Sequence, residues 1–116
     1  GTVLSLLDRV FYAGGCYAAH KPAAAVVSAR RGGTTAALDV LTKYFTISQM
    51  PVVSSTYWPM VHGNRPEEAA ADLEGLQTMR NLGRNMAYLL RCIEAGRQAG
   101  VRAPEAERAC RTNFIR

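Results

Sequence analysis

Apolar side chains recur along the chain with spacings that predict helices in some segments and strands in others. In residues 2–12 they stand three or four positions apart, with Asp8 and Arg9 on the other side, so this segment is predicted as an amphipathic helix that ends at Gly14–Gly15. Residues 23–28 form a continuous apolar run with β-branched residues toward its end. Such a run is typical of a strand that is buried on both faces of a parallel sheet.

A second helix is predicted shortly after this strand. Thr34 or Thr35 is expected to be its N-cap, because a threonine hydroxyl can accept a hydrogen bond from an N–H of the first turn. Helical spacing then continues until Met50–Pro51, where proline stops the helix. The β-branched pair Val52–Val53 predicts a short second strand.

The last part of the chain predicts a loop and a long helix. Residues 54–64 are expected to form a loop that is unusually rich in aromatic side chains. Pro66 opens the helix, since proline suits the first turn, and helical spacing continues to about residue 96. Gly75 and Gly83 lie on nearly one face of this helix. They either let another backbone come close or are simply tolerated.

This order of elements predicts an α/β fold with an incomplete sheet. The 116 residues suffice for one domain, residues 1–116, but two strands leave an open edge on a strand that expects neighbours on both sides. Either other chains complete the sheet or the sequence is a portion of a longer protein. The first helix has no strand before it, which favours the second explanation.

Composition and charge narrow the class of protein. Apolar residues make up 48% of the chain and charged residues 20%, which is ordinary for a globular domain. No apolar run approaches the roughly 18 residues of a membrane span, and no secretory signal opens the chain, so we expect a cytoplasmic protein without a membrane partner. The net charge is +5, but the arginines are scattered from Arg9 to Arg116. This favours a solvated basic surface, and no nucleic-acid partner is expected.

The cysteines and serines do not form a recognisable reactive site. Cys16, Cys92 and Cys110 lie far apart and lack zinc-site spacing, so buried or incidental free thiols are expected and no metal site. The serines lack a nucleophile-elbow pattern, and neither histidine has an obvious acidic partner, so no catalytic residue is assigned. A chain without its own acid, base or nucleophile suits a cofactor enzyme.

Two loops carry the candidate binding residues. The first follows the first strand and comprises Ala29, Arg30, Arg31, Gly32 and Gly33. Glycines let a ligand approach the backbone, and arginine offers planar donors that also stack on rings; a plain turn with solvated arginines is the alternative.

The second loop carries Tyr57, Trp58 and His62, which either pack against protein or line a flat apolar ligand. Because the carboxyl ends of parallel strands meet at one edge of a sheet, both loops are expected to face one pocket.

Several segments together resemble a known family. LLDRVFYAGG, SARRGG, SSTYWPMVHG and DLEGLQTMRNLGRNMAYLL are similar to segments of the flavodoxin-fold NADPH-dependent FMN reductases, which are related to multimeric flavodoxins and to flavin-dependent quinone and azo reductases. The resemblance implies a three-layer α/β/α fold with a five-stranded parallel sheet that binds FMN at its carboxyl edge. It also implies hydride transfer from NADPH or NADH to flavin N5, and then to an acceptor.

The resemblance assigns flavin contacts to residues of both loops: Ala29, Arg30, Arg31, Gly32, Gly33, Thr34, Tyr57, Trp58 and His62. It implies that the chain corresponds to the C-terminal part of the family's fold, which is about two strands and three helices. The phosphate-binding loop belongs to the absent N-terminal part. Activity would then require the absent portion, and a homodimer or tetramer is expected. The alternative is a non-enzymatic oligomeric or partner-binding module that retains the back half of the flavodoxin fold.

Overall fold

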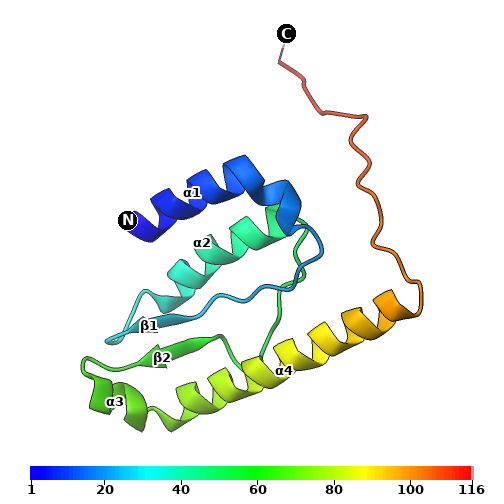
Figure 1. The fold of residues 1–116 in the computed structure, drawn as a ribbon. Helices are drawn as coiled ribbons and strands as arrows, with labels where there is room; N and C mark the ends of the chain where they lie inside the picture. The colour runs from blue at the N-terminus through cyan, green and yellow to red at the C-terminus, as the bar shows by residue number, and fades with distance from the viewer. Residues whose placement is uncertain (116) are drawn as a thin grey trace.

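Helices and a small parallel sheet alternate along residues 1–115, which are the residues that the computed structural model describes (Figure 1). In chain order the elements are α1 (Thr2–Gly14), the 3-10 helix η1 (Gly15–Ala18), β1 (Val27–Ala29), α2 (Thr34–Ile47), β2 (Met60–His62), α3 (Pro66–Ala71) and α4 (Leu73–Gln98). β1 and β2 pair in parallel. The α/β fold class is therefore confirmed, while Arg116 lies outside the described residues.

The helices lie on both sides of the sheet. α2 contacts β1, α4 contacts β2, and α1 rests against α2 on the β1 side of the molecule (Figure 1). Within the described residues, no helix is long and apolar enough to cross a membrane.

The packing of α1 against α2 follows from the predicted amphipathic pattern. The ring centroid of Phe11 lies 5.5 Å from that of Tyr44 and 6.2 Å from that of Phe45. The Tyr44 hydroxyl also donates a hydrogen bond to the Asp8 carboxylate. This bond to the anionic oxygen raises the pKa of Tyr44 above its usual value, because loss of the phenolic proton would place two negative charges together.

The start of α2 differs from the prediction. Its N-cap is Gly33, with φ of 82° in the left-handed region, and no side chain caps the helix. Thr34 is already helical and is only 5% exposed. Its hydroxyl donates to the Met60 sulfur at 3.3 Å and accepts no hydrogen bond from an N–H of the helix start. The prediction of a threonine cap is wrong because glycine makes the turn and the Thr34 side chain faces β2.

The second strand lies later in the chain than predicted. Val52 makes only an isolated parallel bridge to Ala23, and β2 falls inside the segment that was expected to be a loop. Between the two, the chain leaves the sheet and is held by α4: the Ser55 hydroxyl donates to the Thr78 carbonyl at 2.7 Å, and the Asn85 amide donates to the Ser54 carbonyl at 2.9 Å. These side-chain bonds produce an excursion that alternation of apolar residues cannot reveal.

The long C-terminal helix is broken once. Pro66 opens α3 as predicted, with Glu67 and Glu68 in its first turn, but the helix ends at Ala71 and α4 starts anew after Asp72. The prediction of one uninterrupted helix is therefore wrong, because the Asp72 carboxylate caps α4.

The two glycines of α4 behave differently. A Cβ added at Gly75 would lie 3.0 Å from the Met60 carbonyl oxygen, so the predicted close approach of another backbone is confirmed there. A Cβ added at Gly83 would meet nothing within 4 Å, so Gly83 has no such role.

The chain buries little surface. Within residues 1–115, the core consists of five apolar residues: Ala23, Leu38, Val53, Met60 and Leu82. The accessible surface is 9252 Å², against about 6,200 Å² expected for a folded monomer of this mass. The radius of gyration is 17.3 Å, against about 13 Å for a compact domain of this length. The expectation that the first strand is buried on both faces is wrong here, since Val26 is 57% exposed and Ser28 is exposed.

Candidate functional site

The carboxyl ends of the two strands lie side by side. Ala29 is paired with His62 in the parallel register, and the N–H of Gly63 donates to the Ala29 carbonyl at 3.1 Å. This register brings His62 next to the start of the Arg30–Gly33 turn. The first loop and His62 therefore lie at one edge of the sheet, while the shared pocket of the two loops stays a prediction.

The turn after β1 presents donors to solvent. Arg30, Arg31, Gly32 and Gly33 are all exposed, and a Cβ added at Gly32 or Gly33 would meet nothing within 4 Å. Because α2 has no side-chain cap, the N–H groups of its first turn remain available at the positive end of the helix dipole. Two arginines beside this helix start make the turn electropositive.

Tyr57 and Trp58 lie at the other end of the second strand than expected. They precede β2, so the prediction that they follow the second strand is wrong with respect to β2. Their ring centroids lie 5.1 Å apart, and the two residues are 54% and 58% exposed. Trp58 lines an open hollow of about 340 Å³ together with Thr35 and Asp39 of α2. The tryptophan therefore lies beside the helix that begins directly after the arginine turn.

Tyr57 and His62 share a smaller hollow on the α4 side. Its volume is about 60 Å³, and Asp72 and Thr78 also line it. Just before β2, Trp58 thus lies beside the start of α2, and Tyr57 lies beside the start of α4. Of the predicted residues, Ala29 ends β1, Arg30–Gly33 form the turn and Thr34 begins α2. Tyr57 and Trp58 lie just before β2, and His62 ends it.

Sequence reasoning missed Asp72, which fixes the geometry of this edge. Asp72 accepts hydrogen bonds from the N–H of His62 at 2.8 Å and from the N–H of Gly75 at 2.9 Å. The bond from His62, and then that from Gly75, hold the pKa of the Asp72 carboxyl below its usual value. An aspartate three positions before a helical N–H is a recognisable N-cap signal, but helical spacing across it concealed the break.

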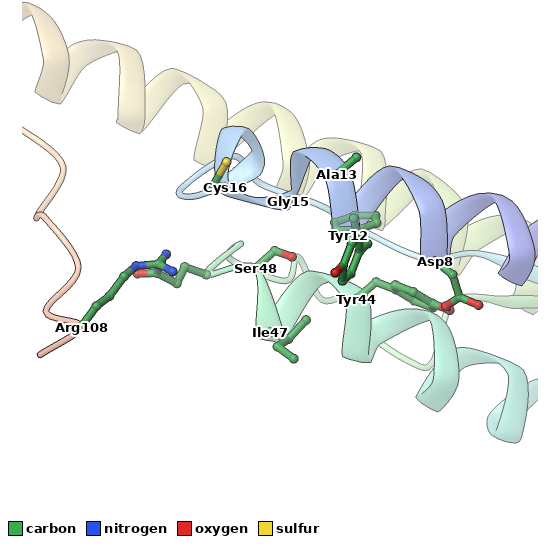
Figure 2. Close-up of a pocket in the computed structure, with 11 residues that line it drawn as sticks. Asp8, Tyr12, Ala13, Gly15, Cys16, Tyr44, Ile47, Ser48 and Arg108 are labelled. Atoms are coloured by element: carbon green, nitrogen blue, oxygen red, sulfur yellow. The ribbon is translucent and has the colours of Figure 1, made fainter. Parts of the chain in front are cut away.

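A larger hollow lies away from the predicted residues, between the ends of α1 and α2 (Figure 2). It has a volume of about 480 Å³, and its lining includes Tyr12, Tyr44, Cys16 and Arg108. Asp8 also lines it, but its carboxylate already accepts the hydrogen bond from Tyr44. The hollow therefore offers an aromatic wall and a cation.

The cysteines and metal-ligand residues complete the inventory of reactive groups. Cys16, Cys92 and Cys110 are free, as expected, and all three are exposed, so burial, one of the two alternatives, is wrong. Across residues 1–115, no three histidine, cysteine, aspartate or glutamate side chains gather as a metal site would require.

Comparison of the chain with protein-family models, with curated proteins and with solved structures found no match.

Proposed function

We propose that this chain forms part of a flavodoxin-like, FMN-dependent NAD(P)H oxidoreductase of the flavin, quinone or azo reductase type. The observation that carries the proposal is the pairing of Ala29 with His62, which joins the arginine turn to the carboxyl end of β2. Ligands of parallel α/β sheets bind beyond the carboxyl ends of the strands. The resemblance of the two loops to flavin-contacting loops agrees with that position.

The residues at this edge could bind a flat ring that has polar groups around its edge. Arg30 and Arg31, together with the uncapped N–H groups of α2, would donate to the carbonyl rim of the isoalloxazine. The exposed indole of Trp58, beside α2, would pack against the ring. FMN supplies the chemistry, which is hydride acceptance from NADPH or NADH, and this chain's residues bind and orient it.

The proposal assigns the phosphate of FMN to protein groups outside this chain. It therefore predicts that the 116-residue chain binds riboflavin and FMN weakly and with similar affinity. Titration with each flavin, followed by quenching of flavin and Trp58 fluorescence, tests this. Trp58→Leu should abolish quenching of flavin fluorescence. Tyr12→Leu, which removes an aromatic side chain that is 97% exposed elsewhere, should leave it unchanged.

Two results would contradict the proposal. Absence of quenching of flavin fluorescence at millimolar flavin would remove the ring site. Much tighter binding of FMN than of riboflavin would mean that the arginine turn holds a phosphate, and the assignment of the ring to this turn would fail.

A second candidate function is a non-enzymatic partner-binding module, acting as a homodimer, a tetramer or a complex with another protein. The specific observation in its favour is the accessible surface of 9252 Å², which exceeds that of a compact monomer of this mass and includes the exposed tail of residues 101–115. A module of this kind would associate with a partner and ignore flavins. Sedimentation and the flavin titration, performed on the same sample, separate the two functions.

A further inference from the structure

Trp58 lines a second hollow besides the one that it shares with Thr35. This hollow has a volume of about 420 Å³ and lies between α2 and residues 52–59. Leu38, Asp39 and Trp58 line both hollows, so the two adjoin at these residues. The proposed flavin site makes no use of the second hollow.

The segment that forms one side of this hollow is held in place by α4. Ser54 and Ser55 are bonded to α4 through the hydrogen bonds described above. The Asn81 amide adds a third bond, because it donates to the Thr56 hydroxyl at 3.2 Å. These bonds hold residues 54–56 against α4, and the space between this segment and α2 is left open.

Apolar and aromatic side chains form much of the lining of this hollow. Leu38 and Val53 belong to the buried core and also line it. The rings of Tyr57 and Trp58 are tilted by 56° to each other, so they form a corner and not a flat stack. The faces of aromatic rings carry partial negative charge and attract cations. The lining therefore combines apolar contact with an attraction for positive charge.

The charge of this hollow is negative, in contrast to that of the whole chain. Asp39 lines it, whereas none of its lining residues is a lysine, an arginine or a histidine. Among residues 1–115, the one ion pair joins Arg97 to Glu94, so the Asp39 carboxylate has no cationic partner. The net charge of the chain is +5. A carboxylate without a counter-charge thus lies beside an aromatic corner.

We propose that this hollow binds a small organic cation whose charge is surrounded by apolar groups, such as a quaternary ammonium ion. The aromatic corner and the Asp39 carboxylate both attract the positive charge, while Leu38 and Val53 contact the apolar groups. Asp39 would repel an anion, and a neutral ligand would gain nothing from this carboxylate. The inference does not depend on the proposed flavin site, although Trp58 contributes to both.

Choline and its uncharged isostere test the proposal on the full 116-residue chain without flavin. The isostere is dimethylbutanol with a tert-butyl group, in which carbon replaces the charged nitrogen. Each compound is titrated at constant ionic strength, and the fluorescence of Trp58, the only tryptophan of the chain, is recorded. Choline should change this fluorescence saturably, with a dissociation constant in the millimolar range. The isostere should bind about fivefold more weakly or less, since it lacks the charge.

Two substitutions test the residues that attract the charge. Asp39→Asn should weaken choline binding about threefold or more and leave binding of the isostere unchanged. Glu105→Gln, which removes a carboxylate from the exposed tail, should bind choline like the natural chain. Trp58→Leu should weaken choline binding about fivefold or more, whereas Tyr12→Leu should not. Saturation-transfer NMR of the choline methyl protons measures binding to Trp58→Leu, because this variant lacks the fluorophore.

Three results would overturn the proposal. Equal binding of choline and its isostere to the natural chain would mean that the hollow is merely apolar. Absence of a saturable change in Trp58 fluorescence with choline would mean that no cation binds there. Unchanged choline binding by Asp39→Asn, in a variant whose circular dichroism matches that of the natural chain, would remove the carboxylate from the site.

Discussion

The carboxylate of Asp72 lies 2.8 Å from the backbone nitrogen of His62, and this hydrogen bond joins the last residue of β2 to the start of α4. The other carboxylate oxygen accepts from the N–H of Gly75 at 2.9 Å. One side chain thus caps a helix of 26 residues and closes the outer edge of the sheet. Removal of this side chain should affect both elements.

We predict that Asp72→Ala lowers the melting temperature and makes it less dependent on acid pH. The pKa of Asp72 is lowered in the folded chain, so the carboxylate stabilises the fold above its unfolded pKa. This stabilisation is lost as the pH falls through the lowered, folded pKa. Thermal unfolding followed by circular dichroism from pH 7 to pH 2 measures the effect. Glu74→Ala is the control, and an equal loss in both variants would contradict the prediction.

We predict opposite effects for alanine at the two glycines of α4. Gly75→Ala should destabilise the chain by about 1–3 kcal/mol, because its Cβ would lie 2.5 Å from the Asp72 carboxylate and 3.0 Å from the Met60 carbonyl. Gly83→Ala should stabilise it by about 1 kcal/mol, since alanine is the better helix former and space is available. Urea unfolding measures both values. Changes of the same sign would contradict the prediction.

The parts of the fold that were predicted from sequence depend on local patterns. The apolar spacing of residues 2–12 gives α1, and Pro66 marks the first turn of α3. The parallel pairing of two strands was also predicted, although its second strand lies at Met60–His62 and not at Val52–Val53. Each of these features is determined by neighbouring residues or by a general rule of α/β sheets.

The parts that were not predicted depend on contacts between distant residues. β2 begins at Met60 and not at Val52, and between the two the Ser55 hydroxyl is bonded to Thr78 of α4. Thr34 does not cap α2 because Gly33 makes the turn and the Thr34 side chain, whose hydroxyl donates to Met60, faces β2. In both cases the side chain could form a hydrogen bond within its own segment but is bonded to a residue far away in the sequence. The neighbouring residues do not reveal that distant partner.

We predict that Gly33→Ala destabilises the chain by about 1 kcal/mol although its side chain would meet no neighbour. The reason is the backbone φ of 82°, which alanine adopts only with strain. Gly33→Asn should cost less, because asparagine tolerates this conformation better. Gly32→Ala is the control, since a Cβ at Gly32 has open space and no positive φ is found there. Urea unfolding of the three variants should therefore rank Gly33→Ala as the least stable.

We predict that Tyr44, one of five tyrosines in the chain, loses its proton at a higher pH than a tyrosine ordinarily does. The hydrogen bond to Asp8 raises the pKa of Tyr44, so its contribution to stability is present below the unfolded pKa and is lost as the pH rises through the folded pKa. Ultraviolet difference absorbance between pH 8 and pH 13 should show a late phase that accounts for one tyrosine. This phase should disappear in Tyr44→Phe and move to lower pH in Asp8→Asn, whereas Tyr12→Phe, at a side chain that is 97% exposed, should leave it unchanged. A late phase that persists in Tyr44→Phe would show that the bond between α1 and α2 does not control it.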